Sequence, residues 1–214
     1  MQSSFSIVVL ISGGGSNLQS IIDAIATTQI NARISAVISN KTNAYGLERA
    51  QQHNIANHVL AHNDFESRED FDTALSEIID QYQPDLVVLA GFMRILTAPF
   101  VQRYYGKMLN IHPSLLPAYK GINTHQRVLQ DGAKTHGVSV HFVTPELDGG
   151  PLIAQASVAV LAEDNIQSLA QRVLKQEHRI YPAVIQWFIE QRLVLVNEKV
   201  HFDNKVLQEP ILYR

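Results

Sequence analysis

The stretch SIVVLISGGGSNLQSIIDAIATT, Ser6 to Thr28, joins an apolar run to an amphipathic segment through three consecutive glycines. The run SIVVLIS predicts a buried strand. In the segment after the glycines, apolar side chains recur at the spacing of one helix face: Leu18, Ile21, Ile22 and Ile25. The stretch therefore predicts a strand, a glycine turn and a helix, the opening of a βα unit.

The same alternation continues along the chain. Apolar runs predict further strands at 32–39, 57–61, 84–92, 107–112, 136–143 and 151–160. Helical spacing predicts helices at 46–53, 70–82, 98–106, 124–132 and 165–191, and the tail, 193–214, reads as a hairpin. The run PDLVVLAGF is apolar on both faces, which suits the middle of a parallel sheet. We predict one α/β domain over 1–214, a Rossmann-like open and mostly parallel sheet with helices on both faces.

The composition is that of a soluble globular protein. The 214 residues are 46% hydrophobic and 17% charged, and the formal charge of −3 favours neither nucleic acid nor a membrane surface as a partner. The absence of cysteine excludes disulfides and thiolate nucleophiles. No apolar run approaches the roughly 18 residues that span a bilayer, and no secretory signal is visible. We therefore expect a cytoplasmic protein with small-molecule partners.

The glycine loop is suited to bind an anion. A helix N-terminus offers unpaired N–H groups and a partial positive charge, and a glycine turn gives a ligand access to them. A P-loop needs Lys and Ser or Thr after its last glycine, whereas Ser16 and Asn17 follow Gly15. A dinucleotide fingerprint starting at Gly13 needs a third glycine where Leu18 stands. The loop therefore fits a single phosphate better, and a tight turn without a ligand is the alternative.

A second group of polar residues lies past the middle of the chain. Asn110 and His112 are two apart in a predicted strand and so share a face near its carboxyl end, where open α/β sheets bind ligands. Asp148 lies in a glycine-containing loop. An amide can stabilise an oxyanion, and an imidazole with a carboxylate can move protons. The three suggest direct acyl transfer to a substrate amine. Ordinary strand-end and turn roles are the alternative.

The other histidines do not predict a metal site. His136 and His141 are five apart in one predicted strand, which places them on opposite faces. His58 and His62 flank a loop without a further ligand in register. The chain also lacks the HExxH pattern. We expect no catalytic metal.

Five segments together resemble one family: VLISGGGSNLQSIIDA, VVLAGFMRIL, LNIHPSLLPAYKGINTH, GVSVHFVTPELDGGPLIAQ and QEHRIYP. In this order they are similar to the phosphoribosylglycinamide formyltransferases. The resemblance implies transfer of a formyl group from 10-formyltetrahydrofolate, a cosubstrate, to the amine of glycinamide ribonucleotide in de novo purine biosynthesis. We expect no metal, and a monomer or a homodimer.

The resemblance also assigns residues. The phosphoribosyl end of the acceptor is expected at Gly15, Ser16, Asn17, Gly91 and Glu177. The folate is expected at Arg68, Met93, Arg94, Ile95, Leu96, Asn110, Thr144, Pro145, Glu146, Leu147 and Asp148. Asn110, His112 and Asp148 match the family's catalytic trio. Without the resemblance, Glu177 reads as a solvated helix residue.

Three alternatives stay open. A methionyl-tRNA formyltransferase is expected to carry a further C-terminal tRNA-binding domain and a basic excess. A folate deformylase is expected to carry an N-terminal regulatory domain before the first strand. A non-catalytic phosphosugar-binding module would keep the glycine loop but would not need Asn110, His112 and Asp148 together.

Overall fold

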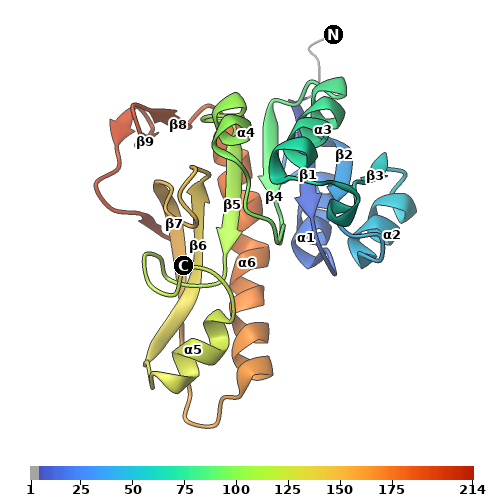
Figure 1. The fold of residues 1–214 in the computed structure, drawn as a ribbon. Coiled ribbons are helices and arrows are strands. Elements are labelled where there is room, and N and C mark those ends of the chain that lie inside the picture. The colour runs from blue at the N-terminus through green and yellow to red at the C-terminus, as the bar shows by residue number, and fades with distance from the viewer. Residues whose placement is uncertain (1–4) are drawn as a thin grey trace. The chain divides into compact units, whose positions relative to one another are not determined.

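The structure is a computed structural model that describes residues 5–214 (Figure 1). It divides into two compact units, Met1–Asn110 and Ile111–Arg214, and strand β5 (Met108–His112) runs from the first into the second. The main sheet is eight-stranded, in the order β11-β7-β6-β5-β4-β1-β2-β3. Whether the two units act as one domain, as the sequence predicts, stays a prediction.

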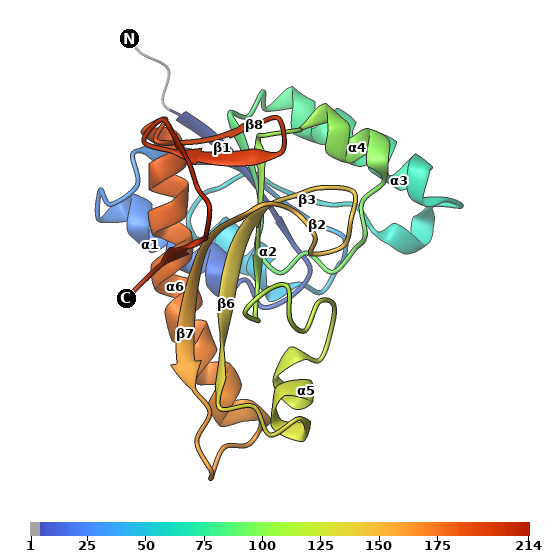
Figure 2. The ribbon, with the colours of Figure 1, turned by 90° about the vertical axis from the view of Figure 1, so that its left-hand side faces the viewer.

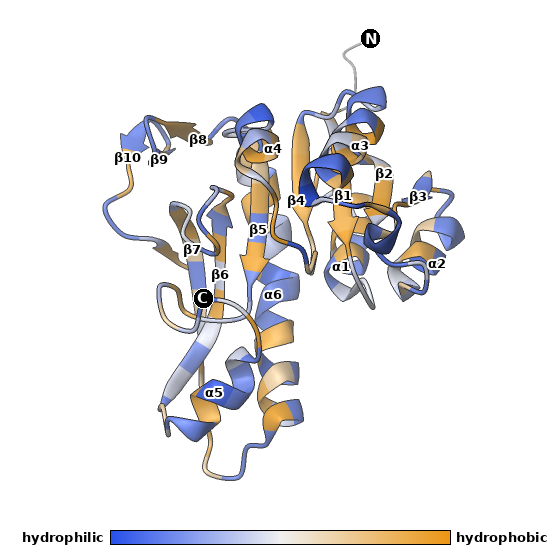
Figure 3. Ribbon diagram, viewed as in Figure 1, coloured by the Kyte–Doolittle hydropathy of each residue, from blue (hydrophilic) through white to orange (hydrophobic). Residues whose placement is uncertain are grey.

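The first unit is built on parallel strands, paired β3-β2, β2-β1, β1-β4 and β4-β5. Their bounds are β1 (Phe5–Ile11), β2 (Ala32–Ser39), β3 (Asn57–Val59) and β4 (Leu86–Leu89), with β5 at the boundary. From Ile7 to Ile11 every residue of β1 is fully buried. Figure 3 shows β1 and β4 as apolar along their length. Such continuous apolar runs are typical of strands covered on both faces.

Helices cover both faces of these strands. They are α1 (Ser16–Ala26), α2 (Tyr45–Gln52), α3 (Arg68–Gln81) and α4 (Ala98–Arg103), and a short 3₁₀ turn spans His62–Asp64. Figure 2 shows α1 on one side of the strands and α3 with α4 on the other. Right-handed crossovers explain why the helices lie on both faces. The connections from β1 to β2 and from β2 to β3 run in one direction along the sheet, and those from β3 to β4 and from β4 to β5 run in the other.

The reversal of strand order places a ligand-binding edge in the first unit. Strand β1 lies between β2 and β4, so the connections diverge between β1 and β4. Open α/β sheets bind ligands outside the carboxyl ends of the strands at such a point. The glycine loop follows β1 there, and the segment from Gly91 follows β4.

The second unit contains an antiparallel pair, β6 (Thr135–Phe142) and β7 (Leu152–Ala159), and β11 (Ile211–Leu212) pairs with β7 in parallel. Helix α6 (Ile166–Ile189) packs on β6 and β7, and α5 (Thr124–Gln130) packs on α6. The tail forms a small separate sheet of β8 (Leu193–Val196), β9 (Lys199–Phe202) and β10 (Lys205–Val206). Its first two strands make an antiparallel hairpin.

The predicted fold class is confirmed: the chain has an α/β fold with an open and mostly parallel sheet. The sheet is mixed because β6 and β7 are joined by a short loop, which allows only antiparallel pairing. Within residues 5–214, none of the helices combines the length and the apolar character needed to cross a bilayer.

Candidate active site

The glycine loop, Gly13 to Gly15, turns two carbonyl groups toward helix α2. The Gly13 carbonyl accepts a hydrogen bond from the Gly46 amide at 3.0 Å, and the Gly14 carbonyl accepts one from Arg49 Nε at 2.9 Å. Because C=O and N–H point in opposite directions across a trans peptide, the amides of Gly14 and Gly15 face away from α2. A Cβ atom at Gly13 or Gly14 would meet nothing within 4 Å. This side of the loop is therefore open to a ligand.

Position 15 requires a glycine, both because of its backbone conformation and because Gly46 lies close to it. It is the N-cap of α1 with φ 68°, in the left-handed region. A Cβ atom there would lie 2.6 Å from Gly46 Cα. No side chain caps the helix, and the first-turn amides have no carbonyl partner inside it. Gly15, Ser16 and Asn17 thus lie where the partial positive charge of an 11-residue helix is available to an anion.

The segment after β4 lies against the glycine loop. The Ala90 amide donates to the Leu10 carbonyl at 2.9 Å, and the Met93 amide donates to Ser12 Oγ at 2.7 Å. Gly91 between them has φ 76°. The structure therefore brings the predicted phosphoribosyl residue Gly91 and the start of the predicted folate segment to the same edge as the glycine loop.

The predicted folate residues of the first unit have mixed surroundings. Met93 is 69% exposed and Ile95 44%, whereas Leu96 is buried. The Arg94 guanidinium stacks on the Phe71 ring at 4.1 Å, and its buried Nε has no hydrogen-bond partner. Arg68 is exposed at the first position of α3, one turn before Phe71. Met93 and Ile95 thus offer apolar surface to a ligand, and Leu96 belongs to the core.

Asn110 and His112 occupy one face of β5, two residues apart. Asn110 pairs with Leu89, the last residue of β4, so it stands at the carboxyl end of these strands. Asn110 is partly exposed and His112 is buried. The predicted placement at the carboxyl edge holds for both residues.

In the second unit, His112 and Asp148 face each other. His112 Nδ1 lies 3.5 Å from Asp148 Oδ2, and their side chains are 8% and 7% exposed. His112 Nε2 lies 2.9 Å from the Tyr119 carbonyl, which can only accept, so Nε2 carries a proton. An imidazole and a carboxylate this close together are groups of the kind that transfer protons in acid–base catalysis.

Further contacts fix Asp148. Its φ of 48° is one that Asp tolerates in turns, and its Oδ2 also accepts a hydrogen bond from the Gly121 amide at 2.8 Å. Its Oδ1 lies 3.9 Å from His141 Nε2. Burial lowers the pKa of His141, whose Nδ1 contacts the Phe142 carbonyl at 2.8 Å. The Gly121 amide therefore orients the Asp148 carboxylate, and a second, buried histidine lies close to it.

The remaining predicted residues of this unit lie on the β6–β7 loop and on α6. In the loop, which contains Thr144 and Pro145, Leu147 is 49% exposed and Glu146 pairs with Lys120 at 2.7 Å. Glu177 lies on α6 and is only 8% exposed. The solvated reading of Glu177 is therefore wrong, and the buried carboxylate is consistent with a binding role.

A pair of histidines, His125 and His136, lies next to the loop that carries Tyr119. His125 Nδ1 and His136 Nε2 are 3.0 Å apart, so one ring donates to the other. Burial and then positive charge on His125 and His112 lower the pKa of His136 from 6.5 to about 4. Burial also lowers the pKa of His125. Both rings are thus held neutral near pH 7.

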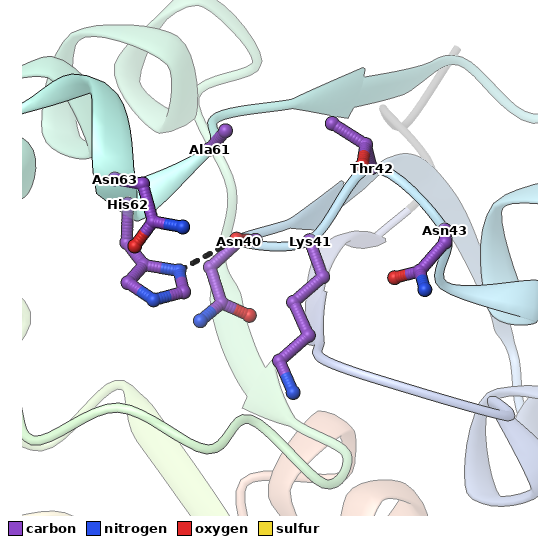
Figure 4. A pocket seen from close by; sticks show the side chains of 7 residues that line it. All are labelled: Asn40, Lys41, Thr42, Asn43, Ala61, His62 and Asn63. Atoms are coloured by element: carbon purple, nitrogen blue, oxygen red, sulfur yellow. Dashed lines mark hydrogen bonds between the residues drawn. The ribbon is translucent and has the colours of Figure 1, made fainter.

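A cavity of about 230 Å³ lies beside the carboxyl ends of β2 and β3 (Figure 4). Six of the seven residues that line it have polar side chains, one of them a lysine: Asn40, Lys41, Thr42, Asn43, Ala61, His62 and Asn63. None of the predicted site residues lines this cavity. It connects to the site through Asn40, whose Oδ1 lies 2.5 Å from Ser12 Oγ.

Five residues around the site have no signal in the sequence, because their role depends on contacts between distant segments: Ser12, Asn40, Arg49, Tyr119 and His141. Gly46 does have a signal, a glycine just inside a short helix, and its close approach to Gly15 explains it. Across residues 5–214, no group of three His, Cys, Asp or Glu side chains is arranged to hold a metal ion.

Comparison with known proteins confirms the family resemblance. The formyl transferase family model matches residues 5–185. A phosphoribosylglycinamide formyltransferase of Escherichia coli (strain K12) is 55% identical over 201 residues, 94% of this chain and 95% of that protein. The solved structure of the phosphoribosylglycinamide formyltransferase from Coxiella burnetii is 50% identical with a TM-score of 0.95, covering 99% of this chain and 100% of that one. The chain belongs to the formyl transferase family, and within it to the phosphoribosylglycinamide formyltransferases.

Proposed function

We propose that this enzyme transfers the formyl group of 10-formyltetrahydrofolate to the amine of glycinamide ribonucleotide. Its membership of the phosphoribosylglycinamide formyltransferases assigns it to purine biosynthesis. The observation that carries the mechanism is the buried pair of His112 and Asp148, 3.5 Å apart.

The acceptor is anchored by its phosphate on the glycine loop. The open side of Gly13 and Gly14 and the first turn of α1 support this role. Gly91 provides a further backbone contact, and Glu177 accepts hydrogen bonds from the ribose hydroxyls. Fixing the acceptor at its phosphate end orients its amine for attack and removes much of the entropic barrier.

The folate is held by Arg68, by the Met93–Leu96 segment and by the loop from Thr144 to Asp148. The exposed Met93 and Ile95 side chains support apolar contact with the pterin. Asn110 contributes a side-chain amide to the same ligand. These assignments rest on the match of each position to the family pattern.

The reaction proceeds by direct attack of the amine on the formyl carbon. The new C–N bond forms as the carbonyl electron pair moves to oxygen, and Asn110 with protonated His112 stabilises that oxygen. Asp148 holds the imidazolium and, through water, helps to move the proton of the attacking nitrogen to the folate nitrogen. Breaking the bond from that nitrogen to the formyl carbon completes the transfer. No covalent enzyme intermediate is needed.

Absorbance of the folate donor, followed with and without the ribonucleotide, tests this proposal. Consumption of the donor that requires the acceptor is the expected result, and acceptor-independent loss would indicate a deformylase instead. His112→Ala should lower kcat by roughly 100-fold or more, the scale of a lost acid–base or oxyanion group. A near-normal kcat would contradict the role of His112.

The setting of the enzyme is also proposed. Its partners are small-molecule substrates, and we propose a cytoplasmic protein that is a monomer or a homodimer. Sedimentation of the purified chain distinguishes the two states.

A further inference from the structure

Ser12 lies at a junction of three segments in the first unit. It follows the last residue of β1 and is only 5% exposed. Its Oγ receives the Met93 amide at 2.7 Å and lies 2.5 Å from Asn40 Oδ1. Met93 follows β4 and Asn40 follows β2, so one hydroxyl connects the carboxyl ends of three parallel strands.

The donors and acceptors at this junction allow one arrangement. A backbone amide only donates, so Met93 occupies a lone pair of the Ser12 oxygen. The amide oxygen of Asn40 only accepts, so the Ser12 hydroxyl hydrogen points to it. The hydroxyl therefore cannot rotate without losing one bond, and at this depth a lost bond is not replaced by bulk water.

Two of the three connected segments adjoin parts of the proposed site. Ser12 immediately precedes Gly13, the start of the proposed phosphate loop. Met93 begins the proposed folate segment. Asn40 is held in turn by His62, whose Nδ1 lies 3.0 Å from the backbone carbonyl oxygen of Asn40 (Figure 4). The glycine loop is thus fixed by α2 on one side and by the Ser12 junction at its start.

We propose that Ser12 is a positioning residue that fixes the phosphate loop and the folate segment in their relative position. This inference rests on the proposed function, because it assigns one substrate to each segment. Ser12 itself touches neither substrate. It acts through the backbone at Gly13 and Met93, so its loss weakens the binding of both substrates together.

Ser12→Ala and Ser6→Ala form the matched test. Ser6 is on the same strand, is 4% exposed and bonds Ser35 Oγ at 2.9 Å, but it lies at the amino end of β1. Ser12→Ala should raise the KM of both substrates about 10-fold, the scale of one lost buried hydrogen bond, and change kcat less. Ser6→Ala should leave both KM values unchanged. A purely stabilising residue lowers the active fraction and hence the apparent kcat, and leaves KM untouched. Unchanged KM values in Ser12→Ala, or equal rises in both variants, would overturn the inference.

Two further variants keep the outcome readable. If Ser12→Ala does not fold, Ser12→Cys replaces it, because a thiol fills the same space but is only a weak acceptor for the Met93 amide. A rise in both KM values then supports the inference, and no rise refutes it. Met93→Ala tests the proposed function separately. If it leaves the donor KM unchanged, the folate assignment fails. If it raises the donor KM while Ser12→Ala does not, the positioning role alone fails.

Discussion

Replacing Gly15 by alanine tests the glycine loop where the structure constrains it most. With φ 68°, an alanine would adopt a left-handed conformation that costs an L residue about 1–2 kcal/mol. Its Cβ would also lie 2.6 Å from Gly46 Cα, a backbone atom on a helix that cannot rotate away. The loop or α2 must therefore move, and the two loop carbonyls would lose their alignment with Gly46 and Arg49.

The expected effect on binding follows from the hydrogen bonds at stake. A hydrogen bond from a backbone amide to a charged phosphate is worth about 1.5–3 kcal/mol. Losing one therefore raises the KM for the ribonucleotide about 10- to 100-fold. Initial rates at saturating donor, with the acceptor varied, measure this. Gly132→Ala is the control, because Gly132 also has a positive φ, 63°, lies outside the proposed site, and would have nothing within 4 Å of its added Cβ, so the acceptor KM should change less than about twofold. A folded Gly15→Ala protein with a normal acceptor KM would refute the reasoning, as would equal rises in both variants.

The remaining predictions concern binding and stability. Glu177→Gln should raise the acceptor KM about fivefold, because a neutral acceptor makes weaker hydrogen bonds to the ribose, and an unchanged KM would remove Glu177 from the site. Asn165→Ala should lower the free energy of unfolding by about 1 kcal/mol without changing kcat, because Asn165 Oδ1 caps α6 by accepting the Ser168 amide at 2.9 Å, and urea denaturation measures the loss. The pKa of His136 is lowered from 6.5 to about 4 in the folded protein. Between these two pH values the unfolded chain carries the proton on His136 and the folded chain does not. The free energy of unfolding should therefore fall on the order of 2 kcal/mol as pH drops from 7 toward 4, and His136→Asn should flatten that part of the dependence.

The sequence predicts elements that local periodicity defines. Strand β2 has the predicted bounds, and the first helix begins at Ser16, directly after the glycines. Strand β4 is shorter than the apolar run that predicts it, because the chain leaves the ladder near Gly91, whose φ is 76°. The two-residue strand β11 has no sequence signal, since two residues show no periodicity and its pairing with β7 is made across the fold.

For the site, too, local spacing in the sequence predicts some contacts, and contacts between distant segments have no signal. The spacing of Asn110 and His112 predicts that they share a face of β5, and their chemical types suggested a link to Asp148. Ser12 could not be found in this way, because its partner Met93 is 81 residues away and a serine after a strand is unremarkable. The burial of Glu177 is likewise set by how α6 packs, not by the residues next to it.

A double-mutant cycle on His112 and Asp148 tests the central claim most directly. The claim is that these two side chains, 3.5 Å apart, act as one proton-handling unit. We predict that kcat at saturating substrates falls roughly 100-fold or more in His112→Ala, and that the double variant with Asp148→Ala is at most a few-fold slower than the slower single variant. Losses that multiply across the two sites would show independent action and contradict the account.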